Sequence, residues 1–180
     1  MALAQEVGTI ISLDGGAQRY DEEMKSITEA SHIVIVARDY AEKYTGTTDL
    51  EEACRIIYER GALIAGVTDG ANGSYFVWPD GTFYRCQAFP QEHVVDTTGA
   101  GDSFHGAFLS KLVTLLRELA PVEGLKTSTY GIDLLQHCGH SDLEKTAIFA
   151  SAVAALNTQG IGGRSPLPSL QVVHKLMGLE

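Results

Sequence analysis

A run of small residues that ends in a carboxylate carries the most specific chemistry in this sequence. Residues 96–102 read Asp-Thr-Thr-Gly-Ala-Gly-Asp, follow two valines and lead into an amphipathic helical pattern. The first turn of a helix has N–H groups without an internal partner and a partial positive charge. Because small residues let an anion approach these groups closely, we expect the amides of Gly99, Ala100 and Gly101 to bind a phosphate.

Asp102 stands beside this expected phosphate site, where its charge would repel an anion. We therefore expect the carboxylate to serve the other reactant. A carboxylate in this position can accept the proton of an attacking hydroxyl, while the neighbouring amides stabilise charge on the transferred group. The loop thus predicts phosphoryl transfer to an alcohol, with Asp102 as the base.

Other interpretations of the loop meet different requirements. A P-loop needs a Gly-Lys pair, and the chain contains none. A dinucleotide fingerprint needs glycine at position 104, where Phe104 stands. A plain helix N-terminus, in which Asp102 merely favours the helix dipole, remains an open alternative from these residues alone.

Apolar strands and amphipathic helices alternate before this loop, which predicts an α/β fold with a partly parallel sheet and helices on both faces. A hairpin is expected around Pro79-Asp80-Gly81. The expected strands are 9–13, 32–37, 63–68, 74–78 and 82–88. Helices are expected at 21–30, directly after the loop, and at 170–176. Two further helices are expected from their caps: one that starts at Thr48-x-x-Glu51 and ends at Gly61, and an alanine-rich one that starts at Ser141-x-x-Glu144 and ends near Gly160. Residues 120–141 have mixed composition and are interpreted as a surface insertion.

Composition limits the function classes. The chain has 180 residues, 44% of them hydrophobic, which suits a single domain over 1–180. The net charge of −10 argues against nucleic acid and anionic membranes as partners. Three scattered cysteines predict reduced thiols and a cytoplasmic protein, and no stretch reads as a signal peptide or a membrane span.

Residues 96–102, with Ser-Phe-x-Gly-Ala-Phe directly after them, resemble the C-terminal signature of the ribokinase-like (PfkB) carbohydrate kinases. The resemblance covers most of the chain. Four further segments carry it: Ser12-Leu13-Asp14, Thr68-x-Gly70-x-x-Gly73, Phe89-Pro90, and Asn157-x-x-Gly160-x-x-Gly163-x-x-Pro166.

The resemblance implies ATP and Mg²⁺ as cofactors and a sugar as the second substrate. It also implies that Asp102 deprotonates the sugar hydroxyl and that the three amides of the loop hold the γ-phosphate. A homodimer is a further expectation. The remaining implied site residues are Thr68, Gly70 and Gly73 in the nucleotide groove, Asn157 and Gly160 near the base, and Asp96 and Thr98 at a monovalent cation such as K⁺.

The sequence departs from the family pattern in two respects. The Asn-x-x-Glu motif that organises Mg²⁺ in many members is replaced by Ala37 and Tyr40, with Asp39 and Glu42 displaced, as in ketohexokinase-like members. The family's N-terminal part and lid are absent, which predicts an open sheet edge and little kinase activity for the chain alone.

Two alternatives therefore stay open: a non-catalytic nucleotide-binding or interaction fragment, and a nucleoside or vitamin kinase of the same superfamily. A separate cluster, His137-Cys138-x-His140, resembles a metal site in residue type, but its residues are crowded into one segment without a second pair at finger-like spacing, so a metal role is not expected.

Overall fold

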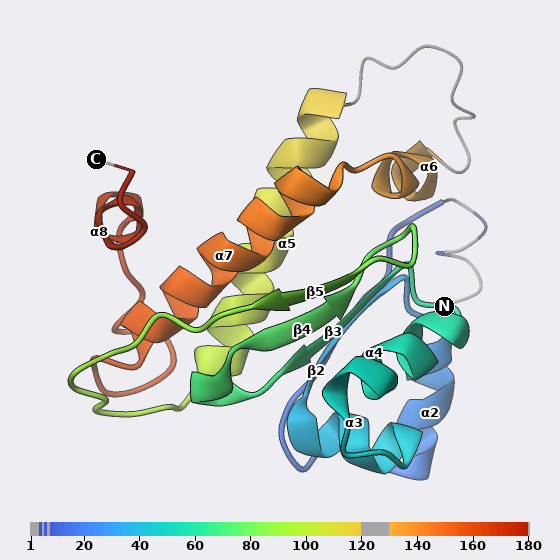
Figure 1. The fold of residues 1–180 in the computed structure, drawn as a ribbon, viewed down its shortest axis with the longest axis horizontal. Coiled ribbons are helices and arrows are strands. Elements are labelled where there is room, and N and C mark those ends of the chain that lie inside the picture. Colours follow the sequence, from blue (N-terminus) through green and yellow to red (C-terminus); the bar gives the residue numbers. More distant parts are fainter. Residues whose placement is uncertain (1–3, 5, 7, 120–129, 180) are drawn as a thin grey trace.

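A five-stranded mixed sheet forms the centre of the computed structural model, which describes residues 4, 6, 8–119 and 130–179. The strand order β1-β2-β3-β4-β5 follows the sequence (Figure 1). The strands are β1 (Ser12–Gly15), β2 (Ile33–Ala37), β3 (Ile64–Thr68), β4 (Ser74–Val77) and β5 (Phe83–Cys86). The first three are parallel, and the last two form an antiparallel hairpin. The predicted α/β class, the partly parallel sheet and the hairpin are confirmed.

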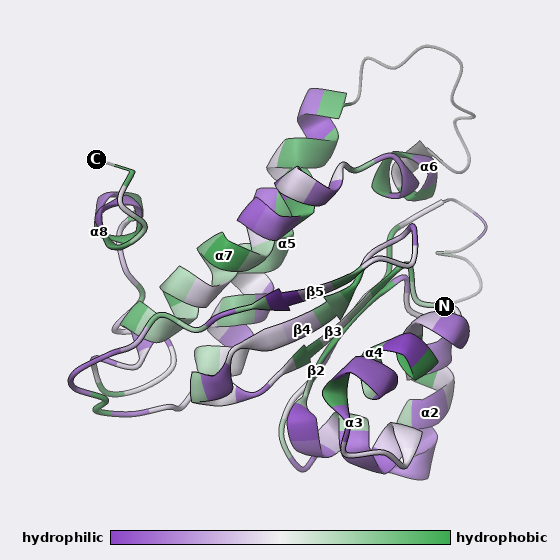
Figure 2. Ribbon diagram, viewed as in Figure 1, coloured by the Kyte–Doolittle hydropathy of each residue, from purple (hydrophilic) through white to green (hydrophobic). Residues whose placement is uncertain are grey.

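Helices cover both faces of the sheet (Figure 1). One face packs against α2 (Glu22–Glu29), α3 (Arg38–Thr45) and α4 (Leu50–Glu59), and the other against α5 (Ala100–Leu119), α6 (Tyr130–Gln136) and α7 (His140–Asn157). A short 3-10 turn, η1 (Gly70–Asn72), follows β3, and α8 (Leu170–Leu176) packs on α7. Figure 2 shows the apolar strands β2 and β3 between these layers, with hydrophilic residues along α2, α3 and α4.

The layer between the sheet and α5 is built on aromatic stacking. Phe76 stacks on Trp78 at 4.7 Å and on Phe108 at 5.6 Å between ring centroids, and all three side chains are fully buried. Gly66 on β3 makes room for Phe76, because a Cβ at that position would lie 2.6 Å from the Phe76 ring. Burying each such side chain stabilises the fold by about 1.5–3 kcal/mol, so this layer holds α5 firmly against the strands.

Several predicted boundaries need correction. Strand β1 lies at 12–15 instead of 9–13, so it begins three residues later and extends through Asp14 and Gly15. The N-cap of α4 is Asp49, whose carboxylate accepts from the amides of Glu51 and Glu52, and not Thr48. Helix α7 begins after Gly139 without a side-chain cap, so Ser141 lies inside its first turn.

Residues 120–141 also differ from the expected surface insertion where the structure describes them. Residues 120–129 lie outside the described part of the chain, but helix α6 follows them directly. Leu135 is fully buried and Cys138 is 8% exposed, and both belong to the core layer beneath α5 and α7. The apolar residues of this segment therefore complete the core, which mixed composition concealed.

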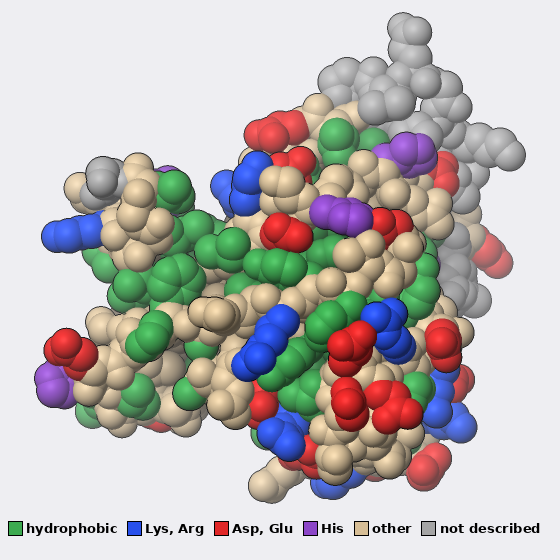
Figure 3. Space-filling view, viewed as in Figure 1, with side chains coloured by type: hydrophobic (Ala, Val, Ile, Leu, Met, Phe, Trp, Pro, Cys, Tyr) green, Lys and Arg blue, Asp and Glu red, His purple; other side chains and the backbone are tan. Residues whose placement is uncertain are grey.

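Strand β1 lies at an edge of the sheet. Its only partner strand among the described residues is β2, so the expected open edge is confirmed. This edge strand spans residues 12–15, whereas the prediction was 9–13. Lysine, arginine and acidic side chains are interspersed over the face shown in Figure 3. Among the helices that the structure describes, none has the length and apolar character needed to cross a bilayer.

Candidate active site

The loop 96–102 forms a tight turn that becomes the first turn of α5. Gly99 adopts a φ of +76°, a conformation that other residues rarely take. The Ser103 amide and hydroxyl both donate to the Gly99 carbonyl, at 2.8 and 2.7 Å, which fixes the start of the helix. The Ala100 amide donates to the Thr97 carbonyl at 3.2 Å. This last bond engages one of the three amides that were expected to bind an anion.

The remaining amides of the turn face no acceptor. In the described chain, the amides of Gly99, Gly101 and Asp102 donate to no protein group. A Cβ added at Gly101 would meet nothing within 4 Å, so the turn opens to space on that side. The Asp102 side chain is exposed. One helix start therefore presents unpaired donors and an accessible carboxylate together, which is an arrangement suited to an anion and a proton donor.

Asp96 holds the loop to the segment after α7. Its carboxylate accepts from the Thr98 amide at 2.8 Å and from the Gly162 amide at 2.9 Å. Hydrogen bonds from Thr98 and from the Gly162 amide lower the pKa of Asp96, because they favour its charged form. The Thr158 carbonyl accepts from the Val95 and Asp96 amides at 2.8 and 3.2 Å. Asp96 thus clamps the loop to a segment that lies 66 residues later in the sequence.

The segment after α7 supports the loop by close backbone contact. A Cβ on Gly99 would lie 2.5 Å from the Gly163 Cα, and one on Gly160 would lie 2.8 Å from Pro166. Asn157 is fully buried, and its Nδ2 donates to the Thr98 carbonyl at 3.5 Å. The Asn157 Oδ1 has no hydrogen-bond partner in the described residues. This unpaired oxygen and the Asp96 carboxylate are of the type that a monovalent cation prefers, so the residues fit the expected cation chemically.

Asp14 lies beside the Asp102 side chain, a placement that the sequence did not indicate. It lies near the end of β1, and its carboxyl is within hydrogen-bond reach of the Asp102 carboxyl. Burial, followed by the charge of Asp102, raises the pKa of Asp14 to about 6, while the nearby Arg19 opposes the shift. A second contact joins the same two elements: the hydroxyl of Ser12 on β1 lies 3.0 Å from the Nε2 of His105 on α5.

The family pattern described as pfkB family carbohydrate kinase matches residues 2–170. The chain belongs to this family. Mouse ketohexokinase is 32% identical over 123 residues, which cover 62% of this chain and 40% of that protein. Cytidine kinase of Thermococcus kodakarensis is 35% identical over 89 residues, which cover 48% of this chain and 31% of that protein.

Solved structures of PfkB-type kinases share the fold. Fructokinase from Vibrio cholerae O395, with fructose, ADP and calcium bound, matches with a TM-score of 0.73 and 22% identity over 99% of this chain and 53% of that one. Ribokinase from Giardia lamblia matches with a TM-score of 0.70 and 18% identity over 91% of this chain and 50% of that one. This PfkB chain therefore spans about half the length of these two structures, and less than half of the two curated relatives above.

The other predicted nucleotide residues of this PfkB chain lie at the end of β3. Gly73 has a φ of +98°, and a Cβ there would lie 2.2 Å from the Cys86 carbonyl oxygen, so packing against β5 requires glycine. Gly70 has open space around it, and the Thr68 hydroxyl donates to the Val36 carbonyl at 3.5 Å. No hydrogen bond between described residues joins this turn to loop 96–102. The structure therefore brings Asp96, Thr98, Gly99 and Asn157 together but does not bond Thr68, Gly70 or Gly73 to them.

The acidic residues displaced from the missing Asn-x-x-Glu motif are engaged elsewhere. Arg38 pairs with Glu42 at 2.8 Å and with Asp69 at 3.1 Å. The Asp39 carboxylate accepts from the Gln18 amide at 2.5 Å, and Tyr40 is fully buried. Asp39 and Glu42 thus each have one carboxylate oxygen engaged within the protein.

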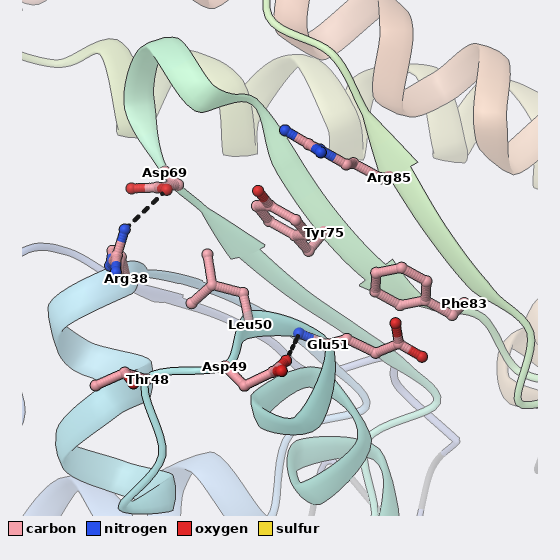
Figure 4. Close-up of a pocket in the computed structure, with 9 residues that line it drawn as sticks. All are labelled: Arg38, Thr48, Asp49, Leu50, Glu51, Asp69, Tyr75, Phe83 and Arg85. Atoms are coloured by element: carbon pink, nitrogen blue, oxygen red, sulfur yellow. Dashed lines mark hydrogen bonds and ion pairs between the residues drawn. The ribbon is translucent and has the colours of Figure 1, made fainter.

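A hollow of about 430 Å³ lies on the α3–α4 side of the sheet, away from α5 (Figure 4). Arg38 and Asp69 pair across one end of it, and the Asp49 carboxylate is used by the start of α4. Arg85 lies over the Tyr75 ring at 5.3 Å. The charged groups of this hollow thus already have partners within the protein, and the hollow shares no residue with the candidate active site.

The cluster His137-Cys138-x-His140 is dispersed in the fold. The His137 Nδ1 lies 2.6 Å from the Asp133 carbonyl oxygen, and His140 contacts the Asp80 carboxylate in the β4–β5 turn. Cys138 is buried in the core. Within the described residues, no group of three or more His, Cys, Asp or Glu side chains is placed to hold a metal ion.

Proposed function

We propose that this PfkB chain binds Mg-ATP and takes part in transferring the γ-phosphoryl group to a sugar hydroxyl, with Asp102 as the base. One observation carries the proposal. An exposed carboxylate and the unpaired amides of Gly99 and Gly101 share a single helix turn. An anion site without the carboxylate would bind phosphate only, and a carboxylate without the amides would repel it.

The residues divide the work of the transfer between them. The amides of Gly99, Gly101 and Asp102 bind the transferred phosphoryl group, and the Ala100 amide joins them when its bond to Thr97 opens. The Asp102 carboxylate orients the acceptor hydroxyl and receives its proton. Mg²⁺ bound with the nucleotide neutralises charge on its phosphates.

The nucleotide and a monovalent cation bind beside the turn at 96–102. Thr68, Gly70 and Gly73 line the phosphate side of the groove, and Asn157 and Gly160 lie near the base. Asp96, Thr98 and the unpaired Asn157 Oδ1 hold a monovalent cation such as K⁺, which would also support the clamp on the loop. A fructokinase from Vibrio cholerae with 21% identity to this chain was solved with fructose, ADP and potassium ion bound.

A sugar is the favoured acceptor, and a nucleoside is the alternative within the same chemistry. The match to ketohexokinase covers 62% of the chain, whereas the match to cytidine kinase covers 48%. The same turn would serve either acceptor, because Asp102 acts on a hydroxyl and not on the rest of the molecule. A panel of sugars and nucleosides therefore has to decide between them.

A non-catalytic nucleotide-binding role is the second candidate. The unpaired edge of β1 in the described part of the chain, and the lack of a hydrogen bond there between loop 96–102 and the turn after β3, favour it. In such a role the anion-binding turn would hold Mg-ATP while the acceptor hydroxyl lacked the contacts that keep it in line. Loss of those contacts removes most of the rate, since phosphoryl transfer depends on holding both reactants in register.

Two measurements on the purified chain test these proposals in order. Calorimetric titration with Mg-ATP should show binding, and a coupled ADP assay with the acceptor panel then separates transfer from binding alone. Asp102→Asn should retain nucleotide binding and lose any transfer, while Glu118→Gln, an exposed change near the far end of α5, should alter neither. Absence of Mg-ATP binding by the wild-type chain would refute both candidates.

A further inference from the structure

Two polar pairs join β1 to the first turns of α5. Side chains alternate along a strand, so Ser12 and Asp14 point to the same side of β1. Residues three apart share a helix face, so Asp102 and His105 point to the same side of α5. The Ser12 hydroxyl meets the His105 Nε2 at 3.0 Å, and the same register places the Asp14 carboxyl against that of Asp102.

Few other charges face this carboxyl pair. From α5, His105 is 8% exposed and its buried ring has a lowered pKa because of burial, which favours the neutral imidazole. The turn after β1 contributes Arg19, which partly offsets the two carboxyl charges. The neighbouring strand β2 contributes the apolar Ile35 beside Asp14. Since burial and the charge of Asp102 both disfavour the ionised form of Asp14, and Arg19 offsets them only in part, the raised pKa of Asp14 favours the uptake of a proton there.

We propose that Asp14 forms with Asp102 a carboxyl pair that holds the single proton removed from the acceptor hydroxyl. The inference rests on the proposed function and deepens it, because it gives the proton a place after transfer. Asp14 does not touch the substrate in this scheme, so it is a positioning residue for Asp102.

The acceptor O–H bond breaks and its proton moves to a carboxylate oxygen of Asp102. The acceptor oxygen forms a bond to the γ-phosphorus, and the bond from that phosphorus to the bridging oxygen breaks, with its electron pair leaving on ADP. Protonated Asp102 then donates a hydrogen bond to the Asp14 carboxylate, which relieves the repulsion between the two groups.

Carboxyl carbon NMR titration of the whole chain tests this pair without any nucleotide. The Asp14 signal should titrate near pH 6 in the wild type and at lower pH in Asp102→Asn, where the charge of the partner is gone. Glu118→Gln is the matched control on α5 and should leave the Asp14 titration unchanged. An Asp14 signal that titrates at its ordinary pH, or that ignores Asp102→Asn, overturns the proposal.

The pH dependence of transfer provides the second readout. Asp14→Asn should displace the acidic limb of the pH–rate profile, whereas a merely structural defect lowers the rate equally at every pH. The two proposals fail separately. If the chain does not bind Mg-ATP but Asp14 titrates near pH 6 and responds to Asp102→Asn, the kinase assignment is refuted and the contact between the two carboxyls stands. If the chain binds Mg-ATP but Asp14 titrates at its ordinary pH, only the carboxyl pair is refuted. If Asp14→Asn does not fold, the titration in Asp102→Asn still decides.

Discussion

Replacing Asp14 by asparagine should stabilise this protein at neutral pH and not at acidic pH. The pKa of Asp14 is raised from 3.8 to about 6 in the folded chain, mainly by burial and then by Asp102. Between these values the folded state binds more protons than the unfolded state, so the free energy of unfolding falls as the pH rises from about 4 to about 6. Below that window both states are protonated, and above it the loss is complete.

The structure sets an upper limit on this effect. A pKa raised from 3.8 to about 6 corresponds to about 3 kcal/mol, at about 1.4 kcal/mol for each pH unit. Asp14 is only half-buried, so screening by water and salt reduces the measured value below that limit. Asparagine keeps the size of the side chain and removes its charge, so the variant should lack this part of the pH dependence.

Urea unfolding at pH 4, 5, 6 and 7 measures the difference between the wild type and Asp14→Asn. The difference is the useful quantity, because burial lowers the pKa values of the partly buried His32 and the buried His105, and both imidazoles give the opposite slope in both proteins. We expect the variant to gain stability relative to the wild type by about 1–3 kcal/mol between pH 4 and pH 7. A difference that stays constant across this range, or changes in the other direction, refutes the assignment of the pair.

Three further changes test the loop and its supports. Asp102→Asn should lower any phosphoryl transfer by about 10²–10⁴-fold in the coupled assay while Mg-ATP affinity in calorimetry is retained, and equal transfer by the variant would exclude a base role. Gly99→Ala should lower the free energy of unfolding in urea by about 1–3 kcal/mol and weaken Mg-ATP binding, because the φ of +76° and the 2.5 Å distance from an added Cβ to the Gly163 Cα oppose any side chain. Unchanged Mg-ATP binding would mean that the turn is not the anion site. Ser12→Ala should lower the free energy of unfolding by about 1–3 kcal/mol in the same assay, because it removes the hydroxyl that lies 3.0 Å from the Nε2 of the buried His105. An unchanged free energy of unfolding would show that this contact does not hold β1 to α5.

The elements that the sequence predicted best are those with continuous apolar runs or clear turn residues. Strands β2 and β3 and helix α8 fall within a residue of their predicted ranges. Helix α3 was missed, because it starts directly from β2 with Ala37 as an N-cap that makes no side-chain bond. It buries only Tyr40, Ala41 and Tyr44, so its apolar pattern is too short to stand out from the preceding strand.

Within the site, local chemistry was predictable and long-range pairing was not. The loop of Gly99 and Asp102 can be recognised from residue types, because an anion site at a helix start needs only neighbours in sequence. The bond from Asp96 to Gly162 joins residues 66 apart, and the pairing of Asp14 with Asp102 depends on how β1 lies against α5. No periodicity within either segment carries that information, although Asp14 at the end of an apolar strand was a usable signal.

The fold places aspartates in opposite environments around one turn, and this difference argues for a division of roles. Asp96 accepts two backbone amide hydrogens, so its pKa is lowered and it stays ionised as a clamp. Asp14 is partly buried against Asp102, so its pKa is raised toward the range in which a proton can be taken up and released. Pairs of carboxyl groups whose surroundings drive their pKa values apart are the usual means of separating a structural charge from a proton carrier. Exchanging the amide donors of Asp96 for a second carboxyl neighbour should therefore loosen the loop, whereas replacing Asp14 itself with asparagine should leave the loop and the base intact and remove only the place where the proton rests.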